Sequence, residues 1–186
     1  MTVELKQVTA EQLPLVRQAI LDIHVEVRHH DFGLNNAFNS RARFDERLTA
    51  YSSRPGWSAV MGYEDGRPVG FCFGVPLGVD TAWWSSMKEP LPEGFTAENG
   101  KRTVALNEIV VRKPWRGGGV AWQLHEAWLA QREEERVTLL VNPAAGNGAV
   151  QAVYEAWGYS KIGEQQPFPD SPVYASMIRP VRGQLS

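Results

Sequence analysis

Three consecutive glycines, Gly117 to Gly119, separate a long apolar stretch from a helical pattern. The apolar stretch, Thr103 to Val111, contains one acid, Glu108, and predicts a buried strand. After the glycines, Val120, Leu124, Ala127 and Trp128 recur at helical spacing, and we expect the helix to run to about Glu135. A buried strand that passes directly through glycines into a helix is typical of an α/β protein.

Hydrophobic periodicity and turn signals predict the element order β-α-α-β-β-β-α-β-α-β-β. Thr9 lies three residues before Gln12, a capping-box pattern that opens the first helix, and Asp65-Gly66 is a hairpin signal. Strand-helix-strand units in the second half predict local parallel pairing. We therefore expect an α/β fold with a mixed, mostly antiparallel sheet of six to seven strands and helices on both faces. The expected strands are Val3–Val8, Trp57–Tyr63, Val69–Pro76, Thr103–Val111, Val137–Val141, Tyr159–Gly163 and Val173–Ile178, and the expected helices are Thr9 to about Gly33, Arg43–Tyr51, Gly118 to about Glu135, and a helix capped by Asn147 and stopped by Gly158.

Residues Gly78 to Gly100 show neither period and predict an irregular insertion. Its Trp83-Trp84 pair has three candidate roles: a wall of an acceptor pocket, a cover for the core, or a contact in a homodimer. No repeat or low-complexity linker interrupts the chain, so we expect a single domain spanning 1–186.

Composition excludes several classes of protein. The 19 Lys and Arg against 21 Asp and Glu give a formal net charge of -2, which argues against a nucleic-acid partner. Cys72 is the only cysteine, so neither an internal disulfide nor a cysteine-rich zinc site is expected, and a reducing compartment is favoured. The N-terminal residues lack a signal-peptide layout, and no apolar run reaches the roughly 18 residues of a membrane span. We expect a cytoplasmic protein with no membrane partner.

The strand-glycine-helix join is suited to binding an anion. The first amide groups of a helix have no intrahelical partners, the helix dipole is positive there, and glycines let phosphates approach the backbone. Arg112 and Arg116 can add charge-assisted hydrogen bonds. No Gly-Lys-Ser/Thr follows the loop, so the Walker pattern fails, and Trp122 lies where the dinucleotide fingerprint needs a small residue.

The segment resembles motif A of the GNAT superfamily, the Gcn5-related N-acetyltransferases. That motif reads Gln/Arg-x-x-Gly-x-Gly/Ala, and Arg116, Gly119 and Ala121 match it. Downstream, Asn147 and the run Tyr154 to Tyr159 resemble a second family motif in order and spacing. The resemblance covers Thr103 to Ile178 by motif and the first half of the chain by topology alone.

The resemblance implies an acyl-CoA N-acyltransferase fold with acetyl-CoA as co-substrate and no metal. It implies that Asn142 and Asn147 contact the coenzyme and that Tyr154 is the general acid for the leaving thiolate. The remaining implied cofactor-binding residues are Ile109, Val110, Val111, Arg112, Arg116, Gly117, Gly118, Gly119, Val120, Ala121 and Trp122. Val150 and Trp115 depart from the usual family pattern.

Glu108 is our candidate general base, because an ammonium must lose a proton before it can attack and some family members carry their base on this strand. The alternative is a structural, ion-paired acid. An N–H group near Val111 is expected to stabilise the oxyanion. His24, His29 and His30 are interpreted as solvated or capping groups rather than metal ligands. Cys72 is not placed to suggest a nucleophile.

The acceptor, a small-molecule amine or a protein amine, is not identified by the sequence. Its site is expected among the first two helices, the insertion and the loop Gln165–Ser171. The acids Glu26, Asp31, Asp45 and Glu46 would make its mouth mildly acidic. Two alternatives to acetyl transfer stay open: a non-catalytic acetyl-CoA-binding regulatory module on the same fold, and a transferase that uses another acyl-CoA.

Overall fold

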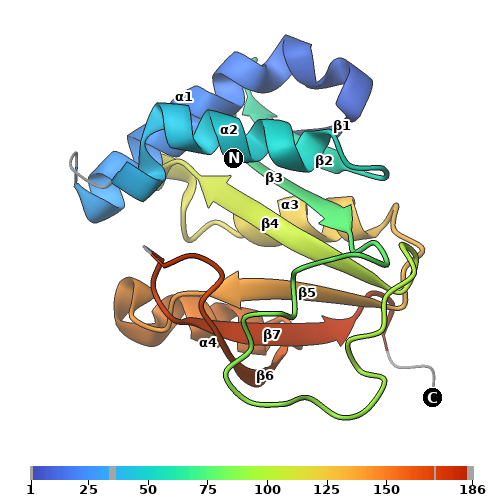
Figure 1. Ribbon diagram of the computed structural model, residues 1–186. Coiled ribbons are helices and arrows are strands. Elements are labelled where there is room, and N and C mark those ends of the chain that lie inside the picture. Colours follow the sequence, from blue (N-terminus) through green and yellow to red (C-terminus); the bar gives the residue numbers. More distant parts are fainter. Residues whose placement is uncertain (1, 34–36, 170, 184–186) are drawn as a thin grey trace. The chain divides into compact units, whose positions relative to one another are not determined.

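The computed structural model describes residues 2–33, 37–169 and 171–183 (Figure 1), so Asp170 of the predicted loop lies outside the described residues. The strands are β1 Glu4–Thr9, β2 Ser58–Glu64, β3 Arg67–Pro76, β4 Thr103–Val111, β5 Arg136–Val141, β6 Ser160–Gln165 and β7 Tyr174–Pro180. The helices are α1 Leu13–Phe32, α2 Arg41–Ser52, α3 Val120–Leu129 and α4 Ala149–Ala156, with 3-10 turns η1 Ala10–Gln12, η2 Ala37–Asn39, η3 Lys113–Trp115 and η4 Ala145–Gly148.

The strands are hydrogen-bonded in the order β1-β2-β3-β4-β5-β7-β6. The pairs β1–β2, β2–β3, β5–β7 and β6–β7 are antiparallel, whereas β4 and β5 are parallel. The prediction of a mixed, mostly antiparallel sheet is therefore confirmed. The chain forms two compact units: residues 1–75 with 106–132, and residues 76–105 with 133–186.

In the first unit, side chains of β2 and β3 alternate between two helical layers. Ala59 and Met61 are buried in one cluster with residues of α1 and α2. On the opposite face the sheet lies close to α3, because a Cβ atom on Gly70 would come within 3.2 Å of Leu124. The same Cβ would lie 2.8 Å from the Val110 carbonyl oxygen, so only glycine permits this close approach. Helices thus cover both faces, as predicted.

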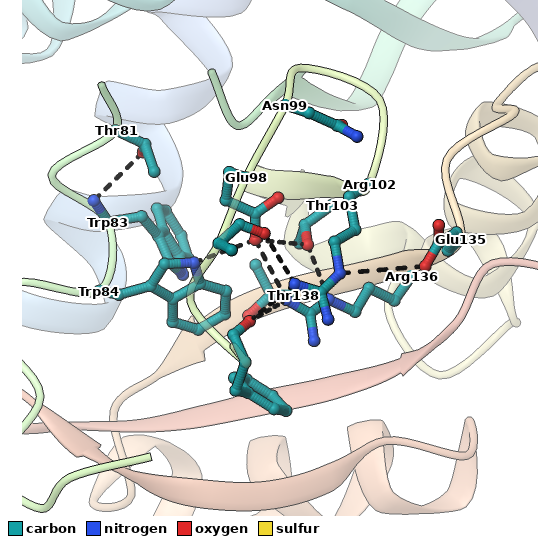
Figure 2. Close-up of polar contacts among 12 residues, drawn as sticks. Thr81, Trp83, Trp84, Glu98, Asn99, Arg102, Thr103, Glu135, Arg136 and Thr138 are labelled. Carbon is teal, nitrogen blue, oxygen red and sulfur yellow. Dashed lines mark hydrogen bonds and ion pairs between the residues drawn. The ribbon is translucent and has the colours of Figure 1, made fainter. Parts of the chain in front are cut away.

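The second unit contains a buried carboxylate, Glu98, at the end of the irregular insertion (Figure 2). Its Oε1 accepts hydrogen bonds from Trp84 Nε1 at 3.1 Å, Thr103 Oγ1 at 2.7 Å and Arg136 Nη2 at 3.1 Å. Arg136 also donates to Thr103 Oγ1 at 2.7 Å and to the Phe95 carbonyl at 2.5 Å. A fully buried carboxylate is tolerated only with such partners. The cluster therefore fixes the insertion to the start of β4 and β5.

The insertion is irregular, as predicted, and it contributes to the core of the second unit. Trp84 is buried with Leu77 and Ala105, and its ring meets Phe95 edge to face at 5.7 Å. Of the three roles considered for the tryptophan pair, the structure gives Trp84 that of covering the core. Met87 forms a bridge with Gln165, so the insertion also pairs with β6.

The predicted helix 118–135 is wrong at its C-terminal end, because α3 ends at Leu129. Arg132 is buried and donates two hydrogen bonds of 3.0 Å to the Gly56 carbonyl. This long-range contact favours an end to the helix before Arg132 over its continuation. The run Glu133 to Glu135 is therefore not a helix end.

The predicted cap of α4 is also wrong. The N-cap residue is Gly148 at φ 89°, and Asn147 precedes it at φ 54°. Gly146 also has a positive φ, of 57°, so three successive residues are left-handed, a conformation in which glycine and asparagine are little strained. Asn147 therefore shapes the turn before α4 instead of capping the helix, while Gly158 ends it at φ 89°, as predicted.

We expect Arg136→Met to lower the free energy of unfolding by about 3–5 kcal/mol, because it leaves the Glu98 carboxylate buried without its counter-charge. The double variant Glu98→Leu/Arg136→Met should recover most of that loss. Urea denaturation followed by circular dichroism measures both. Lys161→Met is the matched control, since it breaks only an exposed pair with Glu164 and should change the stability little. Equal losses for Arg136→Met and Lys161→Met would contradict this account.

Candidate active site

The glycine loop of the first unit joins β4 to α3 through the turn η3. Gly117 and Gly119 both have φ 79°, a left-handed conformation that side chains disfavour. Gly119 is the N-cap of α3, and the first helical hydrogen bond runs from the Gln123 amide to its carbonyl at 3.0 Å. The amides of the first turn of α3, beginning at Val120, therefore precede any intrahelical acceptor.

The space beside these glycines is open. A Cβ on Gly117 would meet no atom within 4 Å, and the nearest atom to a Cβ on Gly119 would be 4.0 Å away. The loop has a backbone conformation that favours glycine, open space beside it, and a helix N-terminus at its end. These three features suit the pyrophosphate of a coenzyme A thioester. The residues present therefore fit the co-substrate expected from the sequence.

The two arginines expected at the phosphates are instead paired with acids of α1. Arg116 binds Asp31 through two hydrogen bonds, Nη1 to Oδ1 at 3.1 Å and Nη2 to Oδ2 at 3.0 Å, and its Nε donates to the Val111 carbonyl at 3.0 Å. Arg112 Nη2 lies 3.3 Å from Glu26 Oε2. Partial burial raises the pKa of Asp31, but its hydrogen bonds from Arg116 and its other neighbours lower it more. These side chains hold the loop to α1, and a phosphate would compete with Asp31 for Arg116.

Trp115, which departs from the usual family pattern, anchors the loop to the β2–β3 hairpin. Its ring is buried, its Nε1 donates to Glu64 Oε2 at 2.7 Å, and the Arg67 guanidinium lies 5.2 Å from its ring centroid. Trp122 has 40% of its surface exposed, on the first turn of α3 beside the loop.

Glu108 lies on β4 and faces α1, where it is ion-paired with Arg28. Its Oε1 is also 3.6 Å from Nδ1 of His24. The Glu108 side chain is 13% exposed and that of Arg28 is 26% exposed. Burial raises the pKa of Glu108, but the Arg28 charge and the His24 ring lower it more, so its pKa lies well below the usual range. Glu108 is thus ionised at neutral pH and is a weak base.

The four acids expected to make the acceptor mouth acidic each have an arginine partner. Beyond the pairs of Glu26 and Asp31, the carboxylate of Asp45 lies 2.6 Å from Arg17 and that of Glu46 lies 3.2 Å from Arg43. These acids therefore add little net negative charge to the two helices.

Three of the expected residues belong to the second unit. Asn142 follows β5, and its Oδ1 accepts a hydrogen bond from the Ala144 amide at 3.0 Å. Asn147 is exposed in the turn before α4, and Tyr154 is buried on that helix two turns later. The Tyr154 ring packs edge to face on Trp157 at 5.4 Å. The fold thus positions Tyr154 firmly.

Sequence reasoning missed two neighbours of Glu108, namely Arg28 and His24. The interpretation of His24 as solvated or capping is wrong, because its side chain is 0% exposed. Its place four residues from Ile20 on the apolar face of α1 is a signal that could have located it. Cys72 is also fully buried, with a raised pKa caused by that burial, which is consistent with its predicted inertness.

The described residues contain no cluster suited to a metal ion. Within residues 2–33, 37–169 and 171–183, no group of three or more His, Cys, Asp or Glu side chains is placed to hold one. Across the same ranges, every helix is too short or too polar to cross a bilayer.

Solved acetyltransferases share this fold. An acetyltransferase from Thermus thermophilus is 18% identical over 97% of both chains, with a TM-score of 0.61. A putative acetyltransferase from Salmonella typhimurium, solved with its cofactor acetyl-CoA, is 15% identical over 100% of this chain and 98% of that one, with a TM-score of 0.62. The ribosomal-protein-S18-alanine N-acetyltransferase from Escherichia coli is 16% identical over 98% of this chain and 96% of that one, with a TM-score of 0.60. At these identities the likeness shows the fold.

Sequence comparison gives the family directly. None of the curated proteins compared with the chain matches it. The model of the acetyltransferase (GNAT) family matches residues 21–159, which include β4, the glycine loop and α4. The chain therefore belongs to the GNAT family of acyl-CoA-dependent N-acetyltransferases.

Proposed function

We propose that the protein transfers the acetyl group of acetyl-CoA to a primary amine by direct attack, without a covalent enzyme intermediate. The observation that carries this proposal is the glycine loop, whose left-handed Gly117 and Gly119 open toward free space at the N-terminus of α3. A putative acetyltransferase from Salmonella typhimurium with this fold was solved with acetyl-CoA, which supports the choice of donor.

Each part of the chain has a role in this proposal. The amides from Gly117 to Trp122 would bind the pyrophosphate, and the β4 backbone at residues 109–111 would lie along the pantetheine arm. Asn142 and Asn147 would make further coenzyme contacts. The coenzyme supplies an activated thioester carbonyl when it is bound. An N–H group near Val111 would stabilise the oxyanion formed on attack.

The proton balance assigns the acid and the base. An alkyl ammonium has three protons on nitrogen and a pKa of about 10.4. One proton stays on the amide product and one passes to the protein before attack. The third leaves the nitrogen after attack and replaces the proton that Tyr154 gives to the departing thiolate, so Tyr154 ends the cycle protonated. Glu108 is the proposed acceptor of the proton that leaves before attack, directly or through water.

The acceptor is proposed to be an amine of either a small molecule or a protein. The Escherichia coli neighbour is named for an alanine of ribosomal protein S18, so peptides with a free N-terminal alanine belong in the test panel. Because the acids of α1 and α2 are paired with arginines, we do not propose a polycationic acceptor.

The direct test is thiol release from acetyl-CoA against a panel of amines and N-terminal peptides. With an accepted amine, Glu108→Gln and Tyr154→Phe should each lower kcat by about 10²-fold or more, because each removes a proton-transfer group. Tyr63→Phe is the control, and we expect it to keep wild-type kcat.

The panel also separates the alternatives. Tight coenzyme A binding with no release for any amine, in wild type and Tyr154→Phe alike, would favour a regulatory binding module. Release from succinyl-CoA but not from acetyl-CoA would favour another donor.

A second prediction concerns the loop. We expect Gly119→Val to weaken coenzyme A binding at least roughly 10-fold in calorimetry, because valine disfavours φ 79° and adds bulk in the open space. Gly94→Val is the matched control: Gly94 has φ 74° and open space beside it, but lies in the insertion. Equal weakening by both variants would show that general destabilisation, rather than the loop, controls binding.

A further inference from the structure

His24 is a buried polar group that the proposed reaction does not yet use. It is 0% exposed, and its ring stacks on Phe44 with 3.5 Å between centroids and 5° between planes. Neither ring nitrogen has a hydrogen-bond partner among the described residues. A buried imidazole without hydrogen bonds costs folding free energy, so its presence calls for a physical reason.

A charged atom of the proposed base lies close to His24. Its Nδ1 lies 3.6 Å from Glu108 Oε1, slightly beyond hydrogen-bond distance. The charged groups that face it are Glu108 from β4, Arg28 from α1 and Arg47 from α2. Tyr51 of α2 is a further titratable group beside Glu108. His24 therefore has one negative neighbour, and that neighbour is also paired with Arg28.

The two groups differ in proton affinity and in access. Burial lowers the pKa of His24 below its ordinary value, although Glu108 partly opposes this, so the imidazole is neutral at pH 7. The pKa of Glu108 is held much lower, chiefly because the positive charge of Arg28 outweighs the effect of burial. Only Glu108 reaches solvent, because His24 is 0% exposed. Glu108, the more accessible group, is thus the weaker base, and the stronger base, His24, lies 3.6 Å from it.

We propose that the proton that Glu108 receives from the acceptor ammonium passes to Nδ1 of His24. This inference rests on the proposed amine acetylation. Glu108 Oε1 accepts the proton and transfers it across the 3.6 Å contact, leaving Glu108 ionised and His24 as imidazolium. After the amide leaves, the proton returns through Glu108 to solvent. His24 acts only through Glu108 and does not contact the acceptor.

The transfer explains two features that packing alone leaves unexplained. Arg28 makes Glu108 a poor final proton acceptor, but the same pairing keeps it ionised and ready to relay the next proton. The unpartnered nitrogens of His24 cost stability in the resting state, and Nδ1 gains a charge-assisted partner only when the proton arrives.

The pH dependence of kcat tests this inference. In wild type, log kcat should fall as the pH decreases through a pKa below about 6.5, because protonated His24 accepts no further proton. In His24→Gln, kcat at about pH 7.5 should fall about 10²-fold, and the acidic limb should move to lower pH. His24→Phe, which can keep the stacking on Phe44, should give the same result if His24→Gln folds poorly.

The control is His125→Gln. His125 is the other fully buried histidine of the described first unit, with Nδ1 2.9 Å from Glu126 Oε1, and its replacement should leave the acidic limb in place. An unchanged limb in both His24 variants would overturn the inference while leaving the proposed function intact. Absence of amine-dependent release in wild type would overturn both.

A measurement without substrate tests the contact itself. We expect NMR titration to give a lower pKa for His24 in Glu108→Gln than in wild type, because the negative charge 3.6 Å from Nδ1 is removed. An identical His24 pKa in both would show that the two groups are not coupled and would overturn the inference.

Discussion

The ion pair between Glu108 and Arg28 joins β4 to α1 within the first unit. A carboxylate in an apolar strand is costly unless a counter-charge accompanies it, and Arg28 is supplied from 80 residues away in the sequence. Once the pair forms, the same face of α1 directs His24 toward Glu108 and buries Ile20 and Ile23. Stability and the proposed proton chemistry therefore depend on one contact. The pair also accounts for the weak basicity of Glu108.

In the glycine loop, the side chains hold the structure and the backbone is left for ligand binding. Its basic side chains are engaged with α1, since Arg112 meets Glu26 and Arg116 meets Asp31. Trp115 ties the other side of the loop to Glu64. What remains available to an anion is the backbone at the start of α3. Amide groups in a fixed loop lose little conformational entropy on binding, because folding has already ordered them.

Local sequence patterns predicted most of the elements. The bounds of β4 agree with prediction, because an apolar run between turn residues is a strong local signal. The end of α3 and the turn at Asn147 were missed for different reasons. Arg132 leaves the helical path to reach Gly56, a contact 76 residues away, and the left-handed conformation of Asn147 has no periodic signal.

By itself, the sequence determined the α/β class, the family and the position of the glycine loop. These depend on short-range properties: periodicity, the conformational freedom of glycine and the spacing between motifs. Only the tertiary structure decided which charges neutralise one another. It paired Glu108 with Arg28, gave Arg116 to Asp31 and buried His24 beside Glu108. The physical reason is that burial and ion pairing depend on which distant segments pack together. Local patterns in the sequence do not show those contacts.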